Sequence, residues 1–219
     1  MPIRPAVSGA SLEWIPVPID PQYTLGLTEI HAQEYRRPRP SGYSIMACLN
    51  GRFGWDWNQA GFGKVEVNDA RLRQSGGTYR TKSGIPFLTP AQGPNAACVS
   101  VWENLPDELR FPLIGRAREV AVFLIGVTNP MQSRVENGRL IVSYLDGGTE
   151  ELALVNPENL DDWLVAAVQT EAETEYFSDR NHGIVERIAV DPGRNLGGLV
   201  VRAVANEVIL GILGITLGR

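Results

Sequence analysis

The apolar residues of this chain occur in short runs punctuated by glycine, proline and asparagine, a pattern typical of β-strands joined by turns. The pattern is clearest over residues 114–155, where we predict strands at Glu119–Gly126, Arg139–Leu145 and Thr149–Val155. The first is almost continuously apolar, which indicates burial on both faces. The other two are joined through the glycines of residues 146–148, which tolerate the positive φ angles of a tight hairpin turn.

Similar short strands are predicted along the rest of the chain, at intervals of about 8–12 residues. The sequence lacks the alternation of strands and helices that builds a parallel sheet. We therefore predict an all-β fold, an antiparallel β-sandwich of the jelly-roll or galactose-binding-like kind, with room for one short helix. The further predicted strands are Leu12–Ile19, Tyr23–Tyr35, Tyr43–Leu49, Arg52–Trp57, Phe62–Val67, Ala70–Gln74, Thr78–Thr81, Ala96–Trp102, Glu108–Leu113, Ile184–Val190, Leu199–Ala205 and Val208–Leu217.

The first and last of these strands carry more specific expectations. Leu12–Ile19 contains Pro16 and Pro18, which cannot donate ladder hydrogen bonds, so it is an edge strand or an extended arm. Val208–Leu217 is apolar on both faces, which suits a central strand or an edge strand covered by a partner. We expect it to pair with its predecessor through a short turn at residues 206–207.

The predicted domain organisation is an N-terminal arm with edge strands over residues 1–42 and the sandwich over residues 43–219, together forming one continuous domain. Within the sandwich, Leu164–Tyr176 has a composition that fits either an amphipathic helix or a strand over its first residues.

Charge and hydropathy exclude some classes of function. The formal net charge is −5 and no basic cluster of useful size is present, which argues against nucleic acid and anionic membranes as partners. No apolar run approaches the roughly 20 residues of a membrane helix. The N-terminus has no apolar signal-peptide core. We expect a cytoplasmic protein, or a periplasmic or extracellular one if a signal or a larger upstream region precedes this chain.

The sequence offers little for catalysis. The two histidines, His31 and His182, have no nucleophile motif beside them, and His182 is expected in a loop. The clustered carboxylates are expected to be solvated or to cap turns, rather than to form the acid–base pair of a glycosidase. A non-catalytic protein without a cofactor is therefore favoured over an enzyme. The clusters are Glu150 with Glu151, Asp161 with Asp162, and Glu171 with Glu173 and Glu175.

The two cysteines, Cys48 and Cys98, lie inside apolar runs. Buried free thiols are favoured, because cysteine behaves as a small hydrophobic residue, and a disulfide between the two stays open. The sequence has no pair of cysteines at zinc-binding spacing, so a zinc site is not expected.

Tryptophans are the strongest candidates for ligand binding. Trp55 and Trp57 are two residues apart on a predicted strand and therefore share one face. They could form a platform for the apolar face of a sugar, or they could fill the core, and the core is slightly favoured. Trp102, at a predicted strand end, has the same two interpretations, and the core is again favoured.

The loop after the first apolar strand offers Asn129, Gln132 and Arg134, and loops on rigid sandwiches often carry recognition. An equally good interpretation pairs Arg134 with Glu136 or Asp146 as a structural ion pair. Asp146 itself is expected to serve its own turn.

Two motifs give the chain a resemblance to known proteins. Galactose-binding-like sandwiches appended to polysaccharide-degrading enzymes often carry a Tyr-x-Asp-Gly-(Gly/Ser)-Thr hairpin and then an Asn-(Ile/Leu)-x-Asp-Trp segment. The matching positions here are Tyr144, Asp146, Gly147, Gly148 and Thr149, and Asn159, Leu160, Asp162 and Trp163. More closely, the chain resembles the C-terminal region of large bacterial proteins that carry the uncharacterised DUF4450 domain. The matching stretches are Leu49–Asn58, Gly84–Pro90, Ser100–Leu109, Thr128–Gly138 and Leu199–Leu217.

The resemblance implies a non-catalytic accessory sandwich whose partner is a carbohydrate or a domain of a carbohydrate-active enzyme. The chain departs from those larger proteins in lacking their helical toroid. By the same analogy a structural calcium ion is an expectation, with hard oxygen ligands from Asn156, Glu158, Asp161 and Asp162. Two alternatives stay open: a structural module that forms homo-oligomers or packs on a partner domain, and a small sandwich lyase or epimerase.

Overall fold

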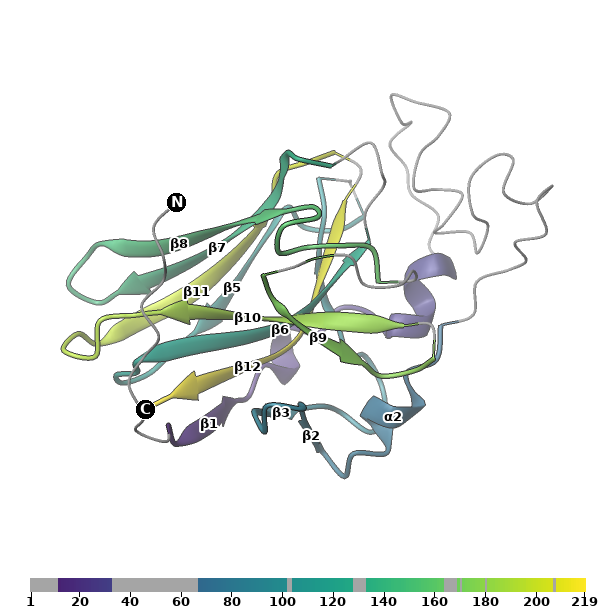
Figure 1. Ribbon diagram of the computed structural model, residues 1–219, viewed down its shortest axis with the longest axis horizontal. Coiled ribbons are helices and arrows are strands. Elements are labelled where there is room, and N and C mark those ends of the chain that lie inside the picture. The colour runs from purple at the N-terminus through teal and green to yellow at the C-terminus, as the bar shows by residue number, and fades with distance from the viewer. Residues whose placement is uncertain are drawn as a thin grey trace.

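The protein is an antiparallel β-sandwich with a third, smaller layer against one of its two sheets (Figure 1). The computed structural model describes residues 12–32, 67–101, 104–127, 133–163, 169, 171–179, 181–206 and 208–219. The two antiparallel sheets of the sandwich confirm the all-β fold class predicted from the sequence. Within the described part of the chain, no helix is long and apolar enough to cross a membrane.

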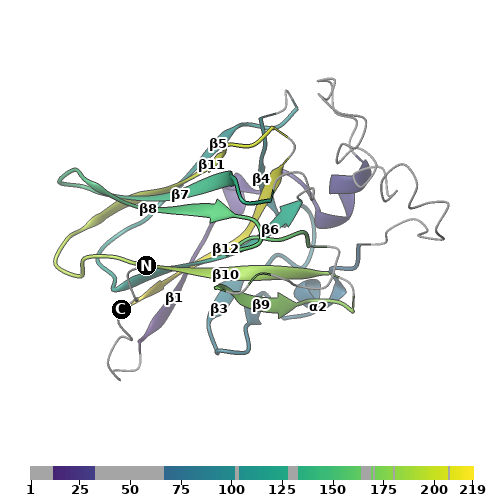
Figure 2. The ribbon, with the colours of Figure 1, turned by 45° about the horizontal axis from the view of Figure 1, so that its top comes forward.

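Two sheets form the sandwich, and we call them the central sheet and the outer sheet (Figure 2). The central sheet has the order β1 (Trp14–Val17), β12 (Ile209–Gly218), β6 (Glu119–Val127), β10 (His182–Ala189) and β9 (Glu173–Tyr176), and β4 (Ala97–Val99) also pairs with β12. The outer sheet has the order β5 (Glu108–Pro112), β11 (Leu196–Ala203), β7 (Glu136–Tyr144) and β8 (Thr149–Val155).

The third layer lies on the far side of the central sheet (Figure 1). It consists of the hairpin of β2 (Thr78–Arg80) and β3 (Pro86–Leu88), the short helix α2 (Ala70–Arg73) and the 3₁₀ turn Leu27–Ala32. A further 3₁₀ turn, Asp20–Gln22, follows β1.

The central sheet is covered on both faces, and this explains why β6 and β12 are apolar throughout. On one face Val122 and Leu124 pack with Leu140 of the outer sheet in the sandwich core. On the other face Phe123 lies against the hairpin layer, with its ring centroid 5.6 Å from that of Tyr79. Burying a side chain of this size contributes about 1.5–3 kcal/mol, so both covers stabilise the sheet.

Most predicted strands are present, including the edge strand. β1 pairs with β12 along its length at the edge of the central sheet. The hairpin of β7 and β8 forms as predicted, with φ angles of 91° at Gly147 and 83° at Gly148. β12 is a central strand, which is one of the two alternatives that its apolar faces indicated.

Two predicted strands are wrong because their spacing is helical. In the described part of Tyr23–Tyr35 the chain forms a 3₁₀ turn, in which Leu27 and Ile30 are three residues apart and both fully buried. Ala70–Gln74 contains α2, whose start is supported by the Asn68 side chain accepting a hydrogen bond from the Ala70 N–H at 2.9 Å.

The predicted pairing of the last two strands is also wrong. β11 pairs with β5 and β7 in the outer sheet, whereas β12 pairs with β1, β4 and β6 in the central sheet. A strand that is apolar on both faces is stable only where layers cover both faces, and the central sheet alone offers such a place.

Some predictions concern residues outside the described ranges. These are the strands at 43–49, 52–57 and most of 62–67, together with the first residues of 164–176, of which the described end forms β9. The proposed boundary between residues 42 and 43 also falls there and stays a prediction.

Candidate functional site

Of the six residues predicted to bind a ligand, the structure describes Arg134. Trp55, Trp57, Trp102, Asn129 and Gln132 lie outside the described residues, so their roles stay predictions. Among the predicted ligand-binding residues, the surroundings of Arg134 can therefore be described.

Arg134 has an unusual backbone conformation and an exposed side chain. Its φ is +60°, in the left-handed region that residues other than glycine seldom adopt. Its N–H donates to the carbonyl of Asn156 at 2.5 Å, which holds this conformation. The residue is exposed, and within the described ranges its guanidinium has no hydrogen bond or ion pair.

The two structural ion pairs considered for Arg134 are not formed, because other arginines hold both carboxylates. Glu136 accepts from Arg139 at 2.6 and 2.8 Å, and this pairing lowers the pKa of the Glu136 carboxyl. Asp146 accepts from Arg194, 48 residues away. The Arg134 guanidinium is left facing solvent.

The described residues that adjoin the predicted binding segments lie at one end of the sandwich, which we call the loop end. Val127, the last residue before 128–132, pairs with Ile209. On the other side of β12, Val99 of β4 pairs with Leu210. Val99 lies two residues before Val101, which is followed by the segment 102–103.

Two further contacts bring other segments to the loop end. Gly138, near the start of β7, packs directly against Leu210, so the chain around Arg134 adjoins the same end. The N–H of Asn68, just after residues 33–66, donates at 2.9 Å to the side chain of Asn181, which precedes β10. Val135 and Val204 add apolar side chains at this end, each a little under half exposed.

A second polar cluster lies where the hairpin layer meets the edge strand β9. Glu175 was predicted to be solvated, and this is wrong: its side chain is buried. It accepts hydrogen bonds from the Lys82 N–H at 2.6 Å and the Tyr79 hydroxyl at 3.0 Å. Burial raises the pKa of the Glu175 carboxyl, and the Glu173 carboxyl beside it raises that pKa further.

The Glu173 and Glu175 carboxyls are engaged by the hairpin rather than open to a substrate like the carboxyls of a glycosidase. The two catalytic carboxyls of those enzymes stand about 5–10 Å apart, with space for a sugar or a water molecule between them. Both carboxyls here instead accept hydrogen bonds from the hairpin, Glu175 from the Lys82 N–H at 2.6 Å and Glu173 from the Ser83 N–H at 3.1 Å. The arrangement anchors the hairpin tip.

His182 forms a buried pair with Asp161, in which Nε2 lies 2.7 Å from the carboxylate. The prediction that His182 lies in a loop is wrong, since it is the first residue of β10 and its N–H donates to the carbonyl of Trp163. The pair is 1–2% exposed and ties the segment after β8 to the central sheet.

The calcium expectation receives little support from this region. Asp161 already uses one oxygen for His182 and the other for the N–H of Gln169 at 3.1 Å. Among the residues that the structure describes, no three histidine, cysteine or acidic side chains are grouped as a metal site.

The Tyr-x-Asp-Gly-Gly-Thr motif forms a clamp at the opposite end of the sandwich, and we call this the clamp end. Arg194 stacks over the Tyr144 ring at 3.8 Å and pairs with Asp146 at 2.5 Å. The Tyr144 hydroxyl accepts from the Asp191 N–H at 2.8 Å. Asp146 thus holds the neighbouring hairpin rather than its own turn alone.

The second motif is structural as well. Asn159 accepts from the Val155 N–H at 2.8 Å and donates to the Ala153 carbonyl at 2.9 Å, which satisfies two backbone groups on the free edge of β8. Trp163 is fully buried in the core beneath the hairpin layer. The motif residues therefore shape the sandwich.

Sequence reasoning missed one aromatic residue beside charged groups. Trp14 on β1 lies under the Arg187 guanidinium, 5.5 Å from the ring centroid, and Arg187 pairs with Glu119 at 2.6 Å. In the alternating strand LEWIPVPI the same-face neighbours of Trp14 are Leu12 and Pro16, so the local sequence does not indicate this charged contact. Because its ring also packs against Gly218, Trp14 is a structural edge residue.

The prediction of a buried free thiol is confirmed at Cys98, where burial raises the pKa to about 12. Cys48 lies outside the described residues.

A comparison with protein-family models finds no family that matches the chain, and a search of curated proteins finds no match either.

Proposed function

We propose that the protein is a non-catalytic carbohydrate-binding or accessory β-sandwich of a polysaccharide-processing system, related to the C-terminal region of DUF4450 proteins. The observation that carries the proposal is the convergence at the loop end. Described residues next to four separate candidate segments, 33–66, 102–103, 128–132 and Arg134, meet there.

The chemistry available at this end suits a sugar. A pyranose presents an apolar face and a rim of hydroxyl groups, which aromatic or aliphatic side chains and a few polar groups bind together. Val135 and Val204 offer apolar surface, and the exposed guanidinium of Arg134, which has no partner among the described residues, offers several N–H donors. Trp55, Trp57 and Trp102 are the aromatic residues that we propose to complete the site.

Binding is favoured over hydrolysis because three acidic groups of the described residues already have structural partners. Glu175 holds the hairpin, Asp161 holds His182, and Glu136 holds Arg139. An oligomerisation module was considered because the strand at 208–217 is apolar on both faces. Within the monomer, neighbouring strands β1 and β6 flank this strand and the two other layers cover its faces, so it needs no partner subunit.

The proposal is tested by affinity gel electrophoresis of the full chain through a panel of neutral and acidic polysaccharides. We expect at least one polysaccharide to retard the protein, and we expect Trp55→Ala and Trp102→Ala to remove most of the retardation. The proposal fails if no polysaccharide retards the wild-type protein, or if both variants bind as the wild type does.

A further inference from the structure

Arg134 presents a cation on a fixed backbone at the loop end. Its N–H donates to the Asn156 carbonyl at 2.5 Å, and the preceding residue, Ser133, forms a parallel bridge with the same Asn156. These contacts hold Arg134 at its φ of +60° just before β7 begins. A group on an ordered backbone loses less conformational entropy on binding than one on a free loop, so Arg134 is suited to recognition.

Two half-exposed valines lie beside this cation. Val135 follows Arg134 directly and is 46% exposed, and Val204, after β11, is 44% exposed. The buried Asn137 joins them, because its side-chain amide donates to the Val135 carbonyl at 2.7 Å and its own carbonyl accepts from the Val204 N–H at 3.0 Å. Arg134, Val135 and Val204 thus form one small surface with a charged part and an apolar part, which we call the arginine–valine surface.

Neighbouring arginines of the outer sheet already have carboxylate partners. Arg139 of β7 pairs with Glu136 at 2.6 Å, and Arg202 of β11 pairs with Glu108 at 2.6 Å. Their positive charges are therefore neutralised within the protein. The Arg134 guanidinium, in contrast, is exposed and has no carboxylate partner among the residues that the structure describes.

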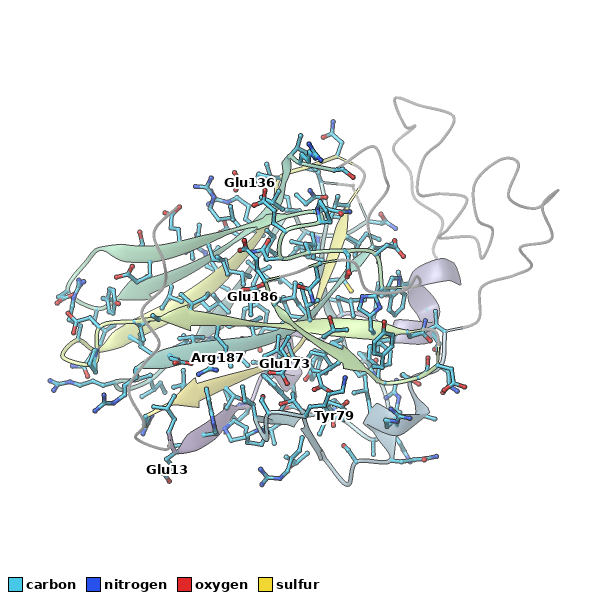
Figure 3. All side chains as sticks on the ribbon, viewed as in Figure 1. Glu13, Tyr79, Glu136, Glu173, Glu186 and Arg187 are labelled. Atoms are coloured by element: carbon cyan, nitrogen blue, oxygen red, sulfur yellow. The ribbon has the colours of Figure 1, made fainter. Side chains whose placement is uncertain are left out.

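Exposed carboxylates elsewhere are not placed to pair with Arg134. Asp107 adjoins β11 on the side away from β7, since its carbonyl accepts from the Ala203 N–H at 2.9 Å. Glu13 precedes β1 at the far end of the molecule. Figure 3 shows Glu13 at the lower edge of the molecule and Glu136, two residues after Arg134, near the upper edge.

The chemistry of this surface favours an anionic ligand over a neutral one. The guanidinium of arginine is a planar fork of N–H donors that matches two oxygens of a carboxylate or a sulfate ester. Hydrogen bonds between charged partners are roughly twice as strong as those between neutral groups. A neutral sugar would offer Arg134 hydroxyl groups alone and would leave its charge without a counterion. The two valines suit the apolar face of a sugar ring.

We propose that the arginine–valine surface is a subsite for a negatively charged sugar, in which Arg134 pairs with a carboxylate or sulfate ester and Val135 and Val204 contact the ring. This inference rests on the proposed function and narrows its ligand to an acidic polysaccharide. The whole chain carries a formal charge of −5, so its overall field repels a polyanion. A preference for an acidic polysaccharide would therefore report a local cationic site.

The test is isothermal titration calorimetry of the full chain with paired soluble polysaccharides, in about 0.15 M salt to screen long-range attraction between exposed charges. Each pair shares a backbone and differs in charge: polygalacturonate and its methyl ester, alginate and its methyl ester, and dextran sulfate and dextran. We expect at least one acidic member to bind about tenfold more tightly than its neutral counterpart, as one hydrogen bond to a charged group provides. A preference in the first two pairs assigns a carboxylate, and a preference in the third assigns a sulfate ester.

Arg134→Gln should remove this preference, and Arg134→Lys, which keeps the charge, should retain part of it. Arg116→Gln, at an exposed arginine of the clamp end, is the matched control and should keep the preference of the wild type. The subsite is overturned, while the proposed function stands, if polysaccharides bind without a preference for an acidic member. It is likewise overturned if the preference survives in Arg134→Gln or is lost equally in Arg116→Gln. If no polysaccharide binds, the proposed function itself fails and the subsite fails with it.

Discussion

The two ends of the sandwich use similar backbone geometry with opposite side-chain arrangements. At the clamp end, positive φ angles fall on Gly147 and Gly148, and the neighbouring charges of Asp146 and Arg194 neutralise each other. At the loop end, a positive φ falls on Arg134, whose guanidinium has no partner in the described structure.

The difference separates a structural turn from a candidate binding turn. Glycine adopts a positive φ without strain, so Gly147 and Gly148 form the turn at the clamp end without a conformational cost. An arginine in the left-handed region carries a cost of about 1–2 kcal/mol. Strain of this kind, when it holds an unpaired charged group in place, is a reason to look for function.

The largest expected effect is on binding. Arg134→Gln should weaken the binding of a retarding polysaccharide about tenfold, because a hydrogen bond from a charged donor contributes about 1.5–3 kcal/mol. Arg116→Gln is the control, since Arg116 is an exposed arginine that precedes β6 at the opposite end. Affinity electrophoresis at several ligand concentrations gives the dissociation constants of both variants. Equal losses of affinity in Arg134→Gln and Arg116→Gln would contradict the proposal that the ligand binds at the loop end.

The next effect is on stability at the clamp end. Gly147→Ala should lower the free energy of unfolding by about 1–2 kcal/mol, because alanine is strained at a φ of 91° while the space around the position is open. Gly197→Ala, a glycine for which no positive φ is found, serves as the control in urea denaturation. An unchanged free energy of unfolding in Gly147→Ala would mean that the turn accommodates alanine without strain.

A smaller effect of opposite sign is expected at the loop end. Arg134→Gly should raise the free energy of unfolding by about 0.5–1 kcal/mol, since it removes about 1–2 kcal/mol of strain and adds about 0.5–1 kcal/mol of chain entropy cost. The same variant should bind polysaccharide more weakly. A variant that is both less stable and unchanged in binding would contradict the functional interpretation of this turn.

The smallest effect concerns the Asp146–Arg194 pair, which is exposed to solvent and screened. Arg194 lowers the pKa of the Asp146 carboxyl, so the pair stabilises the fold above the unfolded pKa of about 3.9 and this contribution is lost as the pH falls. Asp146→Asn should slightly lower the melting temperature at pH 7 and leave it unchanged near pH 2. A difference in melting temperature between the wild type and Asp146→Asn that grows toward low pH would contradict this prediction.

The sequence predicts those features that depend on local pattern. β6 and β7 are found because a continuous apolar run and the alternation of Leu140, Val142 and Tyr144 with the residues between them each indicate how many faces are covered. Leu27–Ala32 was mistaken for a strand because its i, i+3 apolar spacing occurs among turn residues and is too short to suggest a helix.

The remaining features depend on contacts between distant parts of the chain. The partner of β12 is decided by which layers cover it, and the short turn before it gives no indication of a crossing to the other sheet. Glu175 is buried by Tyr79 and Lys82, more than 90 residues earlier, and Asp161 meets His182 21 residues later. No residue type or spacing in the local sequence marks these pairings.

The central claim, that ligand binds at the loop end, is tested most directly by a hydrogen-exchange footprint of the full chain with and without a retarding polysaccharide. We expect added protection in peptides covering residues 133–138 and 204–210, and none in peptides covering 145–149 and 191–196. Protection confined to the clamp end, or spread equally over both ends, would contradict the claim.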